Sequence, residues 1–445
     1  MLPNWATACF TLLLLLGVQL SASASEAPVA APAQPTVENG RLSALRDALA
    51  SGVTDAEAHF WSAVEVAGTP IVESTEDHPD EARVTFLWKG TAETQSVRLI
   101  SGPQIISKFK NLGFRRLDGT DVWFLTLHVP LGWRVGYMLV ENAEQHGYPK
   151  GGAWMAAARR DPFNRFHTEQ DAAAPKSFDK LYSIFETPGA RPEPWLRRHP
   201  GVAAGAVTTR RLTSARLGTE RTVDVYVPVR YGVAGERPAG TVYLFDGDDY
   251  LRDMRIADVL DNLIGEHRIA PLVAVMVRDM PDARDRELSC DPNFTEFLAA
   301  ELVPWVRRNY SVSADPRRTI VGGFSLGGLE AAYVASVHPE LFGAVLSQSG
   351  SFWWRPSSPG AANPSEPWMA TQYAAAGPQQ VRFFLSVGRY EPGPEHEGLI
   401  NNRTMRDVLR ARGYELKYEE VEGQHDPINW RLTLPDGLMF LASRE

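Results

Sequence analysis

The strongest constraint on the fold is a glycine-flanked serine between a strand-like run and a helix-like run. Residues 323–327 are Gly-Phe-Ser-Leu-Gly; they follow the apolar run 319–322 and precede a helical pattern that starts near Gly328. A strand that turns sharply into a helix needs residues without bulky side chains on both sides of a strained serine. We therefore predict that Ser325 is a nucleophile at the carboxyl edge of a sheet. The backbone N–H of Leu326, at the amino end of the helix, is then placed to stabilise an oxyanion.

The region around this serine alternates strands with helices. Residues 271–277, Pro-Leu-Val-Ala-Val-Met-Val, form a continuous apolar run, which is typical of a strand buried on both faces. Alternating strands and helices predict an α/β fold, with a mostly parallel sheet covered by helices on both sides. On this pattern we assign residues 206–445 to an α/β-hydrolase catalytic domain. Its predicted strands are 223–227, 241–245, 271–277, 319–322, 343–347, 382–387 and 416–421, and its predicted helices are 254–267, 294–309, 329–337 and 398–412.

The preceding part of the chain has a different pattern. A chain of 445 residues is long enough for two domains. Short β-like runs separated by turn residues predict an antiparallel β-sandwich domain over residues 41–165, with one helical stretch over 42–61. Residues 166–205 are rich in proline, alanine, glycine and charge, so we interpret them as an interdomain linker. The predicted strands of the sandwich are 83–88, 96–100, 122–129 and 135–140.

The first residues have the pattern of a signal peptide. The apolar run 11–20 is shorter than the roughly 20 residues that a membrane-spanning helix needs. Residues 22–24, Ala-Ser-Ala, supply a small-residue cleavage site. We predict a signal peptide over 1–24, a flexible leader rich in alanine and proline over 25–40, and export of the mature protein without membrane insertion.

Charge and spacing exclude several other partners. The formal net charge of −9 repels polyanions, so we expect no nucleic-acid partner. Residues 245–249, Phe-Asp-Gly-Asp-Asp, place three aspartates close together, but the remaining spacing of a calcium-binding loop is missing. We therefore expect no metal site and no cofactor. The same loop follows the predicted strand 241–245, and the backbone N–H of Asp248 is the predicted second oxyanion donor.

A serine nucleophile needs a base to take its proton. In the α/β-hydrolase fold the chain order is serine, acid, histidine, and the histidine lies in a loop after the last strand. Among ten histidines, His425 meets this requirement because it follows the predicted strand 416–421. His396 is the rival, but it precedes the predicted helix 398–412 and lies too early. We therefore predict His425 as the general base.

The acid that orients the histidine is expected in the loop after the predicted strand 382–387. This loop contains Glu391, Glu395 and Glu397. Glu391 lies only a few residues past the strand and is followed by a proline, which stiffens the backbone that presents it. We therefore predict Glu391 as the acid. Glu395, Glu397 and a Ser–His dyad without any acid stay open as alternatives.

Several further motifs together resemble those of one known family. The most specific is 346–354, Leu-Ser-Gln-Ser-Gly-Ser-Phe-Trp-Trp. The others are 60–61, 84–88, 119–123, 161–164, 246–247, 286–290, 323–328, 389–392, 423–426 and 429–431. On these motifs, residues 55–440 resemble the enterochelin (enterobactin) esterases. The resemblance implies hydrolysis of the trilactone ester bonds of ferric enterobactin, a catecholate siderophore. Iron enters only as part of that substrate, and the leader indicates a periplasmic member of the family.

The resemblance also implies a cationic, aromatic binding wall, because the substrate is a triply anionic iron complex with aromatic faces. Arg286 is the first candidate for contacting catecholate oxygens, since a guanidinium pairs with two oxygens at once. Trp353 and Trp354 could stack on catechol rings. The remaining arginine candidates are Arg278, Arg389 and Arg355.

Two other functions use the same features. A secreted carbohydrate esterase of the feruloyl or acetyl-xylan type combines the same fold with a β-sandwich module. Fold analogy alone does not distinguish this function from that of a siderophore esterase. A siderophore-binding protein without activity is the second alternative, against which the intact Ser325 and His425 pattern argues. An arginine-lined pocket favours the siderophore esterase, whereas a neutral aromatic groove favours the carbohydrate esterase.

Overall fold

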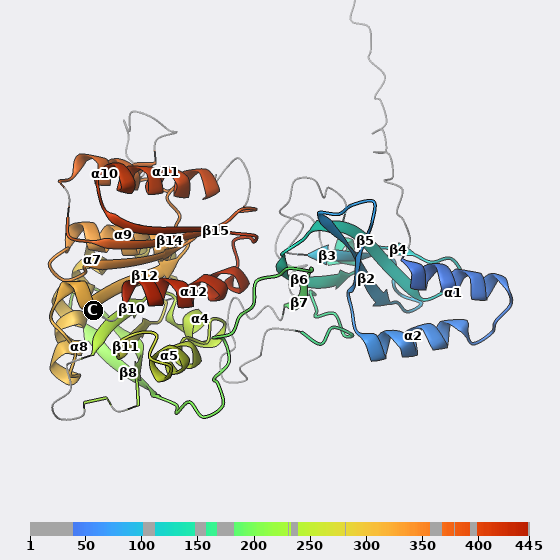
Figure 1. The fold of residues 1–445 in the computed structure, drawn as a ribbon, viewed down its shortest axis with the longest axis horizontal. Helices are drawn as coiled ribbons and strands as arrows, with labels where there is room; N and C mark the ends of the chain where they lie inside the picture. Colours follow the sequence, from blue (N-terminus) through green and yellow to red (C-terminus); the bar gives the residue numbers. More distant parts are fainter. Residues whose placement is uncertain are drawn as a thin grey trace, which may run out of the picture. The chain divides into compact units, whose positions relative to one another are not determined.

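A computed structural model describes most of the chain after residue 38. The described residues are 39–100, 112–146, 157–166, 182–229, 231–232, 239–280, 282–356, 367–377, 379–391 and 398–443 (Figure 1). The predicted signal peptide, 1–24, and the predicted leader up to residue 38 lie outside them. Within the described residues, no helix is both long and apolar enough to cross a membrane.

The carboxy-terminal part is built on an eight-stranded sheet in the order β15-β14-β13-β12-β10-β11-β9-β8. The six strands from β15 to β11 are parallel, and β9 and β8 are added antiparallel at one side. This arrangement confirms the predicted mostly parallel sheet. The bounds are β8 Ala206–Ser214, β9 Thr219–Val227, β10 Gly240–Leu244, β11 Leu272–Val277, β12 Thr319–Phe324, β13 Ala344–Gln348, β14 Arg382–Gly388 and β15 Glu415–Val421.

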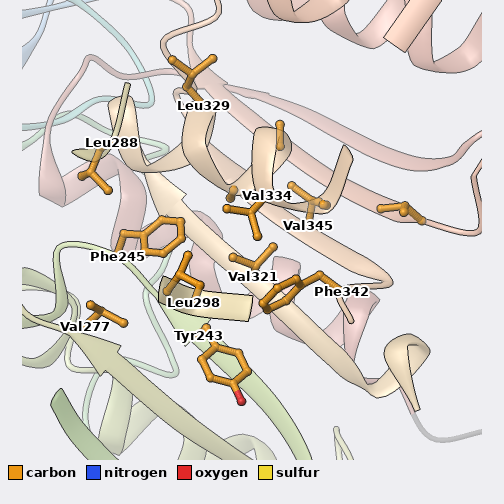
Figure 2. Close-up of a cluster of buried hydrophobic side chains, with 14 of the residues drawn as sticks. Tyr243, Phe245, Val277, Leu288, Leu298, Val321, Leu329, Val334, Phe342 and Val345 are labelled. Atoms are coloured by element: carbon orange, nitrogen blue, oxygen red, sulfur yellow. The ribbon is translucent and has the colours of Figure 1, made fainter. Parts of the chain in front are cut away.

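Helices cover both faces of this sheet, which explains the continuous apolar strands. Successive side chains of a strand point to opposite faces. In β11, Val273 and Val275 therefore enter one core and Leu272 and Ala274 enter the other. The first core, part of which Figure 2 shows around Val321, includes residues of α7, α8, α9, α10 and α11; the second includes residues of α4, α5 and α12. The bounds are α4 Gly247–Arg252, α5 Ile256–Gly265, α6 Arg284–Glu287, α7 Pro292–Phe297, α8 Val303–Asn309, α9 Leu326–Val337, α10 Trp368–Ala375, α11 Gly398–Ala411 and α12 Pro427–Leu441.

The amino-terminal part contains two antiparallel sheets, β1-β2-β5-β4 and β3-β6-β7. Phe86 from the first sheet packs against Tyr137 and Phe185 from the second, so the two sheets share one core, as a β-sandwich does. The helices α1 and α2 pack against the other face of the first sheet, through residues such as Leu42 and Trp61. The bounds are α1 Gly40–Ala50, α2 Ala56–Ala67, β1 Ile71–Ser74, β2 Glu81–Lys89, β3 Val97–Ile100, β4 Arg115–Arg116, β5 Val122–Pro130, β6 Arg134–Glu141 and β7 Ser183–Glu186.

Two expectations for this part differ from the structure. The interval 166–205, interpreted as a linker, contributes β7, in which Phe185 pairs with Val135 of β6. The composition of 166–205 does not indicate this short strand. The strand forms by pairing with β6, which lies about 50 residues earlier in the sequence. The single helix expected over 42–61 is two helices. The chain breaks between them at Gly52, whose φ of +79° is accessible to glycine at little cost.

Candidate active site

Ser325 lies in a strained turn between β12, which ends at Phe324, and α9, which begins at Leu326. Its φ of +54° and ψ of −122° are unusual for a residue with a side chain. The turn is tight on both sides, because a Cβ atom at Gly323 would lie 2.5 Å from the carbonyl carbon of Gly327. The glycine pattern of the sequence is therefore a steric requirement of the elbow that presents the Ser325 hydroxyl.

Three predicted catalytic side chains form one hydrogen-bonded chain. The Nε2 atom of His425 lies 2.9 Å from Oγ of Ser325, and its Nδ1 atom lies 3.0 Å from Oε2 of Glu391. Each residue follows the carboxyl end of a different strand: Ser325 follows β12, Glu391 follows β14 and His425 follows β15. Parallel strands end at the same edge, so the sheet order brings together residues that are 100 positions apart. The rival residues Glu395, His396 and Glu397 lie outside the described residues.

Glu391 is held by more than the histidine. Its side chain is only 2% exposed. Its Oε1 atom accepts the backbone N–H of Gly388 at 2.9 Å and the hydroxyl of Ser349. The Ser349 oxygen in turn accepts the indole N–H of Trp430 at 2.8 Å. Together these hydrogen bonds fix the direction of the carboxylate toward His425.

An aromatic wall supports the histidine ring. The ring of Trp430 meets that of His425 nearly perpendicularly, with centroids 5.1 Å apart. Trp430 also stacks on Phe324, with the ring centroids 4.0 Å apart and the ring planes 13° from parallel. Sequence reasoning missed both Ser349 and Trp430. The motifs 346–354 and 429–431 contained them, but their contacts with Glu391 and His425 could be seen only in the folded chain.

The two predicted oxyanion donors lie at the amino ends of two helices, and these helices follow neighbouring strands of the sheet. Leu326 is the first residue of α9, and Asp248 lies in the first turn of α4, directly after β10. Among the described residues, no acceptor bonds to the backbone N–H of either one. Strand β10 pairs with β12, so both helices begin at the same edge of the sheet. The carboxylate of Asp248 lies 3.3 Å from Arg278, and burial raises its pKa above the ordinary value.

The predicted binding residues lie apart from this chain of hydrogen bonds. Arg286 is on α6 with its side chain 68% exposed, at 3.7 Å from the carboxylates of both Glu287 and Asp291. Arg389 follows β14 and forms an ion pair with Glu422 at 2.8 Å. In this conformation both guanidinium groups have carboxylate partners. Any anionic ligand that binds them must therefore compete with these ion pairs or share the guanidinium with them.

The two predicted aromatic residues begin close to the nucleophile. The hydroxyl of Ser351 lies 3.3 Å from that of Ser325, and the backbone N–H of Trp354 donates to the carbonyl of Ser351 at 2.9 Å. The ring of Trp354 is partly buried and packs edge-on against Trp368 with centroids 5.7 Å apart. The side chain of Trp353 is exposed. An exposed indole at this place can contact a ligand, whereas the packed one is held by the core.

The arrangement is suited to acyl transfer through a covalent serine intermediate. It provides a nucleophile on a strained elbow, a histidine within hydrogen-bond distance of it, a carboxylate behind that histidine and two backbone donors nearby. On this fold and site, the protein is a serine hydrolase of the α/β-hydrolase class.

Comparison with known families makes the assignment specific. Residues 214–441 match the family model Esterase (“Putative esterase”), and residues 83–196 match the family model “Enterochelin esterase, N-terminal”. The chain belongs to the enterochelin esterase family and is a serine ester hydrolase. The resemblance stated from the motifs is thereby confirmed.

Individual relatives agree over most of the chain. The iron(III) salmochelin esterase of Escherichia coli O6:H1 is 29% identical over 420 residues, covering 90% of this chain and 97% of that protein. The iron(III) enterobactin esterase of Dickeya dadantii is 27% identical, covering 87% and 93%. A crystal structure of the enterobactin esterase FES from Shigella flexneri in the presence of enterobactin matches with a TM-score of 0.69 and 25% identity, over 86% of this chain and 97% of that one.

Proposed function

We propose that this protein hydrolyses the trilactone ester bonds of a ferric catecholate siderophore of the enterobactin type, so that iron can be released. The observation that carries the proposal is the hydrogen-bonded chain of Ser325, His425 and Glu391, with 2.9 Å and 3.0 Å between the bonding atoms. The family and the names of the relatives supply the substrate class. The iron ion belongs to the substrate, and the proposed reaction steps use protein groups and water.

The geometry supports a two-step mechanism. His425 takes the proton of Ser325 while Oγ attacks the ester carbonyl, and Glu391 stabilises the resulting imidazolium. The N–H groups of Leu326 and Asp248 are proposed to bind the oxyanion of the tetrahedral intermediate. The C–O bond of the ester then breaks, His425 gives the proton to the departing oxygen of the substrate's serine unit, and an acyl-enzyme remains. Water, deprotonated by His425, releases the acyl group by the same steps.

Recognition of a triply anionic complex by a chain of net charge −9 requires local positive charge. We propose that Arg286 and Arg389 supply this charge and that Trp353 and Trp354 add aromatic contacts.

We propose that the protein acts in the periplasm. Support comes from the short apolar run 11–20 and the Ala-Ser-Ala sequence at 22–24. Amino-terminal sequencing of the protein recovered from a periplasmic extract tests this, and we expect Ser25 as the first residue. An intact Met1 on protein found only in the cytoplasmic fraction would contradict it.

The decisive experiment is incubation with ferric enterobactin followed by chromatography of the products. We expect linear trimers, dimers or monomers of dihydroxybenzoylserine, and none with Ser325→Ala. A feruloylated or acetylated xylan fragment is the parallel substrate. Cleavage of that fragment alone would replace the proposal by the carbohydrate-esterase function. Tight binding of the siderophore without turnover of any ester would indicate a binding protein.

A further inference from the structure

A second cluster of chemically competent side chains lies on the amino-terminal β-sandwich. Strands β2 and β5 pair so that Arg83 is opposite His128 and Glu81 is opposite Pro130. Ala82 and Val129 from the same strands are buried in the sandwich core. Because side chains alternate between the faces of a strand, Glu81 and His128 share the opposite, outer face.

His78 joins these two residues from the connection between β1 and β2. Its Nδ1 atom lies 3.9 Å from Oε2 of Glu81. Its ring centroid lies 4.3 Å from that of His128, with the planes 56° apart. One ligand atom from each of the three residues can be chosen so that all lie within 4.8 Å of one another. Two imidazoles and one carboxylate therefore converge on a single point of the surface.

Metal binding would require only a small contraction of this cluster. A zinc ion binds nitrogen and oxygen ligands at about 2.0–2.2 Å, which puts tetrahedral ligand atoms about 3.3 Å apart. The side chain of His78 is 52% exposed and that of Glu81 is 26% exposed. Both can therefore rotate by the necessary ångström without disturbing the core. His128 lies within the paired part of β5, opposite Arg83, and this pairing fixes the position of its backbone.

The surrounding charge favours a cation. The segment 73–81 is Glu-Ser-Thr-Glu-Asp-His-Pro-Asp-Glu and carries five carboxylates. Arg83, on the same face of β2 as Glu81, forms an ion pair with Glu73 at 3.1 Å. Glu73 thus neutralises the charge of Arg83, which lies opposite His128 in the neighbouring strand. A surface rich in carboxylates also raises the local concentration of cations.

We propose that His78, Glu81 and His128 bind one divalent transition-metal ion, with Zn²⁺ as the first choice and water completing its coordination. Imidazole nitrogen selects ions of this class, whereas Mg²⁺ and Ca²⁺ prefer sites made of oxygen ligands. The bound ion would tie the β1–β2 connection to β5 and so stabilise the amino-terminal domain. The proposal does not depend on the proposed esterase reaction, because none of the three residues belongs to it.

The proposed site differs from the sequence-based expectation of no metal. In the sequence, His78 and Glu81 form only an i, i+3 pair in a polar turn, which is common on protein surfaces. His128 is remote in the chain, and only the register of β2 on β5 brings it to them. Spacing rules for metal motifs look for ligands that are close in sequence, so they do not detect this cluster.

Isothermal titration of the mature, chelator-treated chain with ZnCl₂ tests the proposal. We expect one Zn²⁺ per chain, and a loss of affinity of more than about tenfold in His78→Ala and in Glu81→Gln. His59→Ala is the matched control. His59 is an exposed histidine on α2 that lies 3.6 Å from Asp55, and the part of the chain that the structure describes offers it no third ligand. Wild-type affinity in His59→Ala and its loss in the other two variants would establish the site.

A second readout separates loss of the metal from loss of the fold. His78 lies in an exposed connection, so His78→Ala should unfold at the wild-type temperature when no metal is added. Saturating Zn²⁺ should raise the unfolding midpoint of the wild type and of His59→Ala by a few degrees, but not that of His78→Ala. Equal zinc affinity and an equal rise in all of these proteins would overturn the proposal. His128→Ala, if it folds, should behave as His78→Ala does.

Discussion

The indole of Trp430 contacts the ring of His425 and is connected, through the hydroxyl of Ser349, to Glu391 behind that ring. Its ring meets the ring of His425 at 5.1 Å and 89°, and its N–H donates to Ser349 at 2.8 Å. Ser349 then donates to Glu391, which in turn lies 3.0 Å from Nδ1 of His425. One tryptophan thus limits the movement of the imidazole and, through a serine, of the carboxylate behind it.

Trp430→Phe should lower kcat about three- to tenfold with little change in KM. Phenylalanine keeps an aromatic ring beside His425 but removes the N–H that holds Ser349, and a hydrogen bond of this kind contributes about 1 kcal/mol. Steady-state kinetics on ferric enterobactin would measure it. Trp305→Phe, a similar change on α8, should leave kcat unchanged. A rise in KM with constant kcat would assign Trp430 to substrate binding instead.

Ser325→Ala should abolish hydrolysis and leave binding of the ferric siderophore nearly intact. Loss of the nucleophile should reduce turnover by several orders of magnitude, because the catalytic residues act as a unit. Affinity depends instead on cationic and aromatic side chains. Product chromatography and fluorescence quenching by the ferric siderophore measure the two quantities separately. Near wild-type turnover in this variant would contradict the mechanism.

Glu391→Gln should lower turnover tenfold or more with little change in siderophore affinity. An amide keeps the size of the side chain but cannot stabilise the imidazolium that forms when Ser325 loses its proton. Glu395→Gln and Glu397→Gln are the matched controls and should be active. If only one of these two control variants lost activity, that glutamate would be the catalytic acid instead of Glu391. If all three variants kept full activity, a Ser–His dyad would be indicated.

Arg286→Ala should weaken siderophore binding roughly tenfold to a hundredfold, because a charge-assisted contact contributes about 1.5–3 kcal/mol. Arg211→Ala is a suitable control. Arg211 is also exposed and lies 3.5 Å from Glu220, on the edge strand β8. Titration of both variants with ferric siderophore gives the dissociation constants. Equal constants in wild type and Arg286→Ala would show that Arg286 is a surface charge.

Asp249 should make the stability depend on pH. Burial, together with Asp246 and Asp253 nearby, raises the pKa of its carboxyl to about 7, above its ordinary value of 3.8. The folded state therefore binds this proton more tightly than the unfolded chain between about pH 4 and pH 7, and the stability that the proton contributes is lost as the pH rises.

Relative to Asp249→Asn, the wild type should lose about 1.4 kcal/mol of unfolding free energy per pH unit across most of that window. Urea unfolding of both proteins at pH 5, 6 and 7 measures the difference, in which the other titrating groups cancel. A difference that stays constant over this range would show that the Asp249 carboxyl is already ionised at pH 5.

The sequence alone was sufficient for features that depend on neighbouring residues. The elbow at Ser325 could be predicted because Gly323 is required by its close approach to the backbone of Gly327, within the same short segment. The strand β11 could be predicted because side chains on both of its faces are buried and must be apolar. The loops that carry Glu391 and His425 followed from counting strands, since the fold places catalytic residues after strand ends.

The tertiary structure decided everything that depends on which strands lie side by side. Three features join residues that are remote in the chain. They are the pairing of β7 with β6, the hydrogen bonds from Trp430 through Ser349 to Glu391, and the cluster of His78 with His128. Such contacts are set by sheet order and register, and a shift of one residue would direct each side chain to the opposite face. Local sequence patterns specify the elements, but long-range pairing determines which side chains meet.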